Sequence, residues 1–321
     1  MAPTVTTTAG PVSGFAEANG TICFRGIPYG ASTGGTNRFR PPAPVEPWSD
    51  VRECVDWGSR SKQGAMAFAQ LSGARESTVD REAARVRFDA IMALFGGGDL
   101  GPSGDDCLNL NVWTPALDDA KRPVMVWFHG GGFSSGSANN PMYFGDHLAR
   151  RGDVVVVSIN HRLGILGYLH LADVGGDAWE GSGNAGVLDL VQSLEWVRDN
   201  IASFGGDPDR VMIFGQSGGG AKVSTVLAMP AAQGLVHRAA IQSGPGVRAL
   251  TVEQGDALAR AVLAELEIEP SHIERIQEVP TRALATAQNA AMRAVRGAGM
   301  GLAPVVDGTT LPTHPFDPVA S

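Results

Sequence analysis

The sequence has few cysteines and no long apolar run. Its three cysteines, Cys23, Cys54 and Cys107, follow no metal-ligand spacing and suggest no disulfide framework. A reducing compartment is therefore expected. The longest apolar runs, 124–128 and 154–157, contain no more than about five residues, whereas a membrane-spanning helix needs roughly 20. No membrane association is predicted.

The N-terminus and the charge balance exclude further classes. The first residues, MAPTVTTTAGPVSG, lack the basic and apolar regions of a signal peptide, so a cytoplasmic location is expected. The formal net charge is −8 with the acidic residues scattered, and no basic patch suggests a nucleic-acid partner. A hydrophobic content of 43% with 18% charged residues is typical of a folded globular protein.

Glycine, in contrast, is abundant. Many of the 42 glycines stand in runs, at 96–98, 130–132 and 218–220, which indicates that backbone geometry is used at sites. The chain shows no internal repeat and no low-complexity linker, so residues 1–321 are interpreted as a single domain.

The central part of the chain has the pattern of an α/β fold. The nearly continuous apolar runs 124–128 and 153–159 predict strands that are buried on both faces of a parallel sheet. Residues 185–204 place their apolar side chains on one helical face before Gly205-Gly206. We expect further strands at 108–113, 210–214 and 237–242, helices at 76–95, 147–150, 218–229, 252–268 and 271–295, an antiparallel meander over 1–30 and a loop over 38–48. A mostly parallel sheet with helices on both faces is the predicted architecture.

A Gly-x-Ser-x-Gly pattern lies between a predicted strand and a predicted helix, in the run Gly215-Gln216-Ser217-Gly218-Gly219. In this context the pattern forces a sharp turn that raises the serine hydroxyl above the sheet. The helix N-terminus behind it favours developing negative charge. Ser217 is therefore predicted to be a nucleophile; the alternative is a glycine loop with an ordinary N-cap serine.

A second glycine motif, His129-Gly130-Gly131-Gly132-Phe133, directly follows the predicted strand VMVWF. Consecutive glycines allow two backbone N–H groups to turn toward one point, where a substrate carbonyl oxygen could become an oxyanion. The alternative is a plain turn that leaves a strand. His129 itself is interpreted as a packing and hydrogen-bonding residue and not as a catalytic base.

Taken with further blocks in family order, these motifs resemble the type B carboxylesterases, which include bacterial para-nitrobenzyl esterases and, more distantly, cholinesterases. The blocks are FRGIPY (24–29), RFRPP (38–42), DDCLNLNVW (105–113), NHRLG (160–164), GNAGVLD (183–189), FGGDP (204–208), QSG (242–244) and PVVDG (304–308). The hormone-sensitive-lipase-like group also carries HGGGF, but three of these blocks, DDCLNLNVW, FGGDP and PVVDG, argue against it.

The resemblance implies an α/β-hydrolase fold and hydrolysis of small alkyl or aryl esters through a serine acyl-enzyme, without metal or organic cofactor. By position, Ser217 corresponds to the nucleophile. Gly131, Gly132 and Gly218 correspond to the residues whose N–H groups form the oxyanion hole.

The sequence departs from the family pattern at the serine motif and at a cysteine. Gln216 and Gly218 stand where the family usually has Glu and Ala, and the loss of a buried charge beside the nucleophile is expected to alter the pH profile or the preference for cationic substrates. Many extracellular members pair the counterpart of Cys107 with a cysteine near residue 63. The chain has Ser61-Lys62-Gln63 there, so this disulfide is not expected.

The third departure concerns the catalytic acid and histidine, which in the family lie beyond the PVVDG block, near which the chain stops at Ser321. We interpret His314 as a turn residue and Asp307 as a loop-capping residue. The 321 residues are therefore expected to be a fragment, or one chain of a nicked or split enzyme. A C-terminal remainder or second chain would supply the acid, the histidine and the last strands of the sheet.

Two other functions remain open at this point: an inert adhesion or scaffold protein, in which the serine is normally replaced, and a non-catalytic ester-binding fragment. The apolar segment 64–100 is interpreted either as plain helix packing, which we favour, or as an apolar wall of the substrate site.

Overall fold

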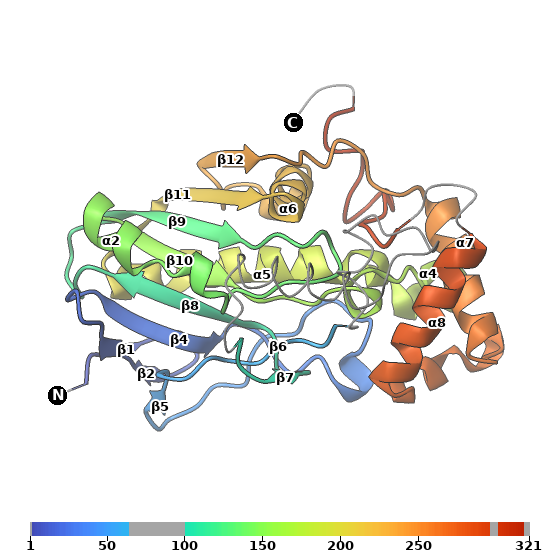
Figure 1. Ribbon diagram of the computed structural model, residues 1–321, viewed down its shortest axis with the longest axis horizontal. Helices are drawn as coiled ribbons and strands as arrows, with labels where there is room; N and C mark the ends of the chain where they lie inside the picture. Colours follow the sequence, from blue (N-terminus) through green and yellow to red (C-terminus); the bar gives the residue numbers. More distant parts are fainter. Residues whose placement is uncertain (1, 64–99, 296–300, 318–321) are drawn as a thin grey trace, which may run out of the picture.

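The structure is a computed structural model that describes residues 2–63, 100–295 and 301–317. A seven-stranded sheet with the order β12-β11-β9-β10-β8-β4-β3 runs through it (Figure 1). Its strands are β3 (Phe15–Ala16), β4 (Ile22–Pro28), β8 (Asn109–Thr114), β9 (Arg122–Phe128), β10 (Val155–Ile159), β11 (Gly206–Gln216) and β12 (Arg238–Gln242). The predicted helix 76–95 lies outside the described residues, as does segment 64–100 apart from Leu100.

The sheet is mixed. The four strands β12, β11, β9 and β10 are parallel, whereas β8, β4 and β3 follow in antiparallel pairs. The two apolar runs that predicted parallel strands form β9 and β10, and every residue of β10 is buried. In register, Phe128 of β9 lies beside Ile159 of β10 and Gly215 of β11, so these strands end at one edge of the sheet.

Short strands flank the main sheet near the N-terminus. They are β1 (Thr4–Thr6), β2 (Pro11–Ser13) and β5 (Arg52–Glu53) in one sheet, and β6 (Arg60–Ser61) with β7 (Ser103–Gly104) in another. The meander predicted over 1–30 is instead two antiparallel pairs, β1–β2 and β3–β4, which belong to different sheets.

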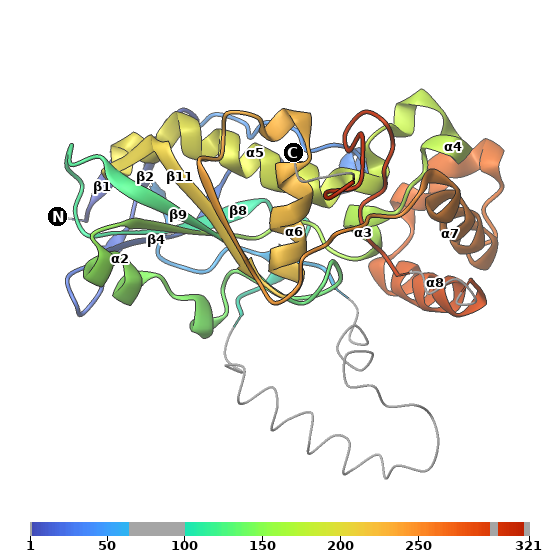
Figure 2. The same ribbon diagram turned by 90° about the horizontal axis from the view of Figure 1, so that it is seen from above.

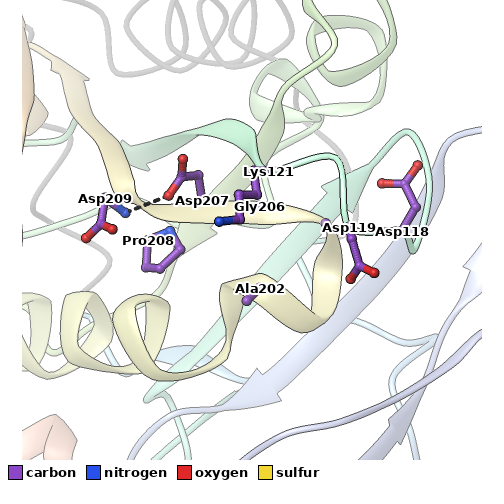
Figure 3. A pocket seen from close by; sticks show the side chains of 9 residues that line it. Asp118, Asp119, Lys121, Ala202, Gly206, Asp207, Pro208 and Asp209 are labelled. Atoms are coloured by element: carbon purple, nitrogen blue, oxygen red, sulfur yellow. Dashed lines mark hydrogen bonds between the residues drawn. The ribbon is translucent and has the colours of Figure 1, made fainter.

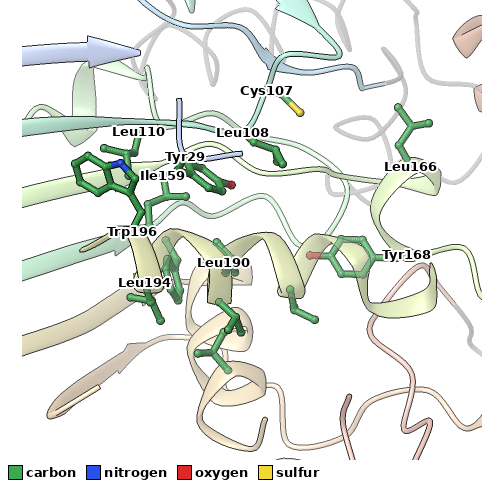
Figure 4. Packing of buried hydrophobic residues seen from close by; sticks show 14 of the residues in the cluster. Tyr29, Cys107, Leu108, Leu110, Ile159, Leu166, Tyr168, Leu190, Leu194 and Trp196 are labelled. Atoms are coloured by element: carbon green, nitrogen blue, oxygen red, sulfur yellow. The ribbon is translucent and has the colours of Figure 1, made fainter. Parts of the chain in front are cut away.

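Helices cover both faces of the sheet (Figure 2). Helix α5 (Ala185–Asn200) and helix α6 (Gly218–Leu227) contact each other and β11, so they share one face. Helix α2 (Asp146–Gly152) contacts β8 and β10, and it lies on the other side of the sheet in Figure 2. Figure 4 shows Leu190 and Leu194 of α5 in the apolar core beside the strands.

A group of helices lies beyond the carboxyl ends of the parallel strands, at the right of Figure 1. It comprises α3 (Ile165–Tyr168), α4 (Ala172–Gly175), α7 (Val252–Glu265), the 3-10 segment Pro270–Glu278 and α8 (Thr281–Ala294). Thr251 and Gln254 form a capping box that begins α7. The stretch 271–295, expected to be helical throughout, is divided before Pro280, because proline disfavours the helical conformation in the residue before it. Shorter 3-10 turns occupy Gly35–Asn37, Pro141–Tyr143, Asp177–Trp179, Ser182–Asn184, Ile201–Phe204 and Pro230–Ala232.

A buried ion pair links the loop after β10 to α5. The guanidinium Nε of Arg162 lies 2.9 Å from Oδ2 of Asp189, which also accepts the backbone N–H of Arg162 at 2.9 Å. The side chains of Arg162 and Asp189 are 2% and 0% exposed. A second guanidinium nitrogen donates to the carbonyl of Arg40, so the pair fixes the path of the chain beside the sheet.

All three cysteines are free and buried. The Cys107 thiol lies beside a hydroxyl group: Thr33 Oγ1 is 4.0 Å from its sulfur. Within residues 2–63, 100–295 and 301–317, every helix is too short or too polar to cross a bilayer.

Candidate active site

Two neighbouring parallel strands deliver the two glycine motifs to the same edge of the sheet. Strand β9 ends at Phe128 and leads into the glycine run that begins at His129, while β11 ends at Gln216 and leads into Ser217. Since Phe128 and Gly215 are partners in the register, the two turns leave the sheet side by side. This carboxyl edge is where ligands bind in open α/β sheets.

Ser217 has an unusual backbone conformation. Its φ of 57° and ψ of −121° lie in a region that costs a residue with a side chain on the order of 1–3 kcal/mol. Its N–H donates to the carbonyl of Gln242 on β12 at 2.8 Å, and its carbonyl accepts from Ala221 of α6 at 3.1 Å. An ordinary cap would also show the hydroxyl accepting from the first turn of the helix, and Ser217 makes no such bond. The strained turn therefore leaves the Ser217 hydroxyl without a hydrogen bond to the first turn of α6.

Glycines allow the serine turn to touch the glycine loop. A Cβ added at Gly219 would stand 2.0 Å from the carbonyl oxygen of Phe128, and one added at Gly130 would stand 3.0 Å from the carbonyl oxygen of Gln216. These positions are in backbone contact, so larger residues would separate the serine from the loop.

The loop after β9 folds back on itself. Gly131 has a φ of +99°, and its carbonyl accepts the N–H groups of Ser134 at 3.3 Å and Ser135 at 3.1 Å. The Gln63 side chain holds the end of the loop, because its amide donates to the carbonyl of Gly136 and accepts the N–H of Gly136, both at 2.9 Å. No sequence pattern indicated this role of Gln63.

Three backbone N–H groups at this site have no protein acceptor in the described part of the chain. They belong to Gly131 and Gly132 in the loop and to Gly218, the first residue of α6. The N–H groups in the first turn of a helix have no carbonyl acceptor within the helix. Uncommitted N–H groups beside a serine can bind a developing negative charge.

His129 is buried below the loop, as a packing residue would be. Its Nδ1 donates to the carbonyl of Gly130 at 2.8 Å, and its ring stacks on that of His161 with the centroids 5.0 Å apart. Burial holds the pKa of both imidazoles well below the usual value for histidine, and the charge of Lys222 lowers them further. A neutral, enclosed imidazole with these partners supports the interpretation of His129 as a structural residue.

His314 and Asp307 have the structural roles that their sequence context predicts. Nδ1 of His314 accepts the N–H of Ala249 at 3.2 Å. Oδ1 of Asp307 accepts the N–H groups of Thr309 and Leu311, each at 3.0 Å, and so caps the loop. All seven histidines lie in the described residues, and none forms a hydrogen bond with the Ser217 hydroxyl there.

The Gln216 side chain is exposed within the described chain. The sequence comparison led us to expect that the residue before Ser217 is buried. In the described chain Gln216 is not buried. Gln216 is the last residue of β11 and has no partner in β9, which ends at Phe128 beside Gly215.

A hollow of about 350 Å³ lies far from this site (Figure 3). It is formed where β9 and β11 begin, and Asp118, Lys121 and Asp207 are among its lining residues. The serine turn follows the opposite ends of these strands, roughly 20 Å away for a strand of this length. The described residues contain no cluster of His, Cys, Asp or Glu that could hold a metal ion.

Comparisons with known proteins agree with this arrangement. Residues 1–321 match the Carboxylesterase family. The chain is 36% identical over 318 residues to the para-nitrobenzyl esterase of Bacillus subtilis (strain 168), covering 98% of the chain and 59% of that protein. It is 36% identical over 321 residues to the phenmedipham hydrolase of Pseudarthrobacter oxydans, covering 99% of the chain and 58% of that protein.

Solved structures give the same result. The carboxylesterase of Geobacillus stearothermophilus superposes with a TM-score of 0.81 at 37% identity, over 98% of the chain and 57% of that structure. An esterase from Clostridium hathewayi, described as able to hydrolyze aliphatic aromatic polyesters, gives 0.81 at 39% identity, over 99% and 59%. The expected α/β-hydrolase fold is confirmed, and the chain spans a little under three fifths of these relatives. The chain belongs to the carboxylesterase family.

Proposed function

We propose that the protein hydrolyses carboxylic esters through an acyl-enzyme on Ser217. Oγ of Ser217 bonds to the ester carbonyl carbon while its proton passes to a base, and the carbonyl oxygen becomes an oxyanion. The C–O bond to the alcohol then breaks, and the alcohol leaves with the proton. Water attacks the acyl-serine in the same way, which releases the acid and restores the hydroxyl.

The observation that carries this proposal is the contact between the serine turn and the glycine loop. The hydroxyl of Ser217 stands on a strained turn, and the uncommitted N–H groups of Gly131, Gly132 and Gly218 lie in the segments that touch it. We assign these three amides to the oxyanion hole, where losing one donor typically costs about 10²–10³ in rate.

The base and its orienting acid belong to the proposal as well. A serine hydroxyl is a weak nucleophile without a base, and each histidine of the described chain has partners other than Ser217. We infer that polypeptide outside these 321 residues, a C-terminal segment or a second chain, supplies the histidine and the acid. The chain spans 59% and 58% of the length of two relatives. Strand β12, which pairs only with β11 among the described strands, has exposed residues that a further strand would cover.

Small alkyl or aryl esters are the proposed substrates, since relatives include a para-nitrobenzyl esterase and a phenmedipham hydrolase. A cytoplasmic location fits three buried thiols that form no disulfide.

Labelling with a fluorophosphonate tests the proposal. The full-length protein from its natural source should gain one label, located by mass spectrometry on Ser217, and Ser217→Ala should remove both the label and the hydrolysis of p-nitrophenyl acetate. Ser224→Ala, which changes a buried hydroxyl of α6 bonded only within its helix, should retain both. A protein that takes up no label would instead be a scaffold or a non-catalytic ester-binding protein.

A further inference from the structure

Helix α6 carries a buried lysine one and a half turns after the nucleophile. The side chain of Lys222 is 0% exposed, and its amino group donates to the carbonyl oxygen of His129 at 2.9 Å. Lysine is almost never fully buried without a partner. Here the partner is the first carbonyl of the loop that carries Gly131 and Gly132, so the lysine connects the two halves of the site.

The histidine whose carbonyl Lys222 binds belongs to a stacked pair of imidazoles, His129 and His161. Nδ1 of His129 lies 2.8 Å from the Gly130 carbonyl, and Nδ1 of His161 lies 2.8 Å from the Arg162 carbonyl. A carbonyl only accepts, so Nδ1 carries the hydrogen in both rings and each Nε2 presents a lone pair. Neither Nε2 has a hydrogen-bond partner in the described chain.

Lys222 is also the neighbouring charge that acts most strongly on both rings. Both rings therefore lie within the electrostatic reach of the Lys222 amino group, whose hydrogen bond in the described chain is the one to the His129 carbonyl. The Ser224 hydroxyl on the same helix, in contrast, bonds only to Gly220 within the helix.

We infer that Lys222 is a positioning residue of the proposed oxyanion hole: it holds the His129 carbonyl against α6, so that the amides of Gly131, Gly132 and Gly218 stay directed to one point. The inference rests on the proposed function. At Gly218 and Gly132 the two segments meet backbone to backbone, since a Cβ added at Gly218 would stand 2.2 Å from the amide nitrogen of Gly132. The hydrogen bond from Lys222 to the His129 carbonyl holds the segments at this separation.

Kinetics of the full-length protein test the inference. Lys222→Met removes the donor and keeps an unbranched side chain, and should lower kcat for p-nitrophenyl acetate by about 10²-fold, because an error of about 1 Å in position costs that much. KM should change less than about threefold. Lys222→Arg, which keeps a donor, should restore part of the loss, whereas Ser224→Ala should match the wild type.

Hydrogen exchange gives a readout that does not need catalysis. Amides of 130–136 should exchange faster in Lys222→Met and at the wild-type rate in Ser224→Ala. Should Lys222→Met fail to fold, Lys222→Gln keeps a polar donor and should show both defects in weaker form. A wild-type kcat together with wild-type exchange in the methionine or glutamine variant overturns the inference. A wild type that takes up no label at Ser217 overturns the proposed function instead, and the exchange comparison still decides about Lys222.

Discussion

Gly218 lies so close to Gly132 that a Cβ added at Gly218 would stand 2.2 Å from the amide nitrogen of Gly132. Gly218 begins α6, and Gly132 belongs to the loop after β9. The resemblance to the type B carboxylesterases implies alanine at the position of Gly218. In this chain the loop lies too close to α6 to leave room for the Cβ of an alanine at position 218. The short distance between the serine turn and the loop therefore requires glycine at this position.

The first prediction follows from this contact. Gly218→Ala should push the loop away from Ser217 and lower the rate of fluorophosphonate labelling by about 10²-fold, the typical effect of a lost oxyanion donor. Gly220→Ala is the matched control: a Cβ there would meet its nearest neighbours at 3.1 Å, which demands only a small adjustment. Equal labelling rates in the two variants would contradict the prediction.

The sequence predicted the elements on which the site depends. The apolar runs of β9 and β10 identify buried strands because both faces of the sheet are covered, and the strand–Gly-x-Ser-x-Gly–helix order placed Ser217 correctly before α6. The His129 interpretation also agrees with the structure, since its buried ring makes no bond to Ser217.

Other features depend on contacts between distant segments and left no local signal. Lys222 lies in a helix whose alanine, valine and threonine neighbours are mostly buried, so the pattern indicates burial but not the carbonyl that it binds. The bond of Gln63 to Gly136 joins segments far apart in the sequence. Strand β8 is antiparallel to both of its neighbours, β10 and β4. The pattern of apolar residues predicts a strand but does not indicate its direction relative to its neighbours.

The second prediction concerns the buried ion pair. Arg162→Met should leave the Asp189 carboxylate buried without its partner and lower the free energy of unfolding by about 3–5 kcal/mol. The measurement is a urea titration followed by circular dichroism. The control is Arg198→Met, because Arg198 pairs with Asp199 at the surface, and such pairs contribute at most about 1 kcal/mol. If both variants lose a similar free energy of unfolding, the prediction that the buried pair matters more than the surface pair is wrong.

The third prediction concerns thiol reactivity. Burial raises the pKa of Cys107 to about 12, and the pKa values of Cys23 and Cys54 to about 12 and about 11. Because the thiolate is the reactive form, Ellman's reagent should find no reactive thiol among these three in the native protein at pH 8. All three should react in urea. A thiol that reacts at once in the native state would show that the segment around it opens readily.

The fourth prediction concerns stability against pH. Burial lowers the pKa of Lys222 from 10.5 to about 7. Between these values the unfolded chain binds a proton on this side chain that the folded chain does not. The free energy of unfolding therefore rises with pH through this window, by up to about 1.4 kcal/mol per pH unit. His129 and His161 have lowered pKa values, so their effect is confined to the range below about pH 6.5.

A comparison with Lys222→Met isolates the lysine. Urea titrations of both proteins at pH 7.5 and pH 9 should show that raising the pH stabilises the wild type relative to the variant, by about 2 kcal/mol. The three thiols have raised pKa values and destabilise the fold as the pH approaches 9, but they do so equally in both proteins. The difference between the two pH responses therefore reports Lys222 alone. Identical responses would mean that Lys222 keeps an ordinary pKa, and hence that water reaches its amino group in the folded protein.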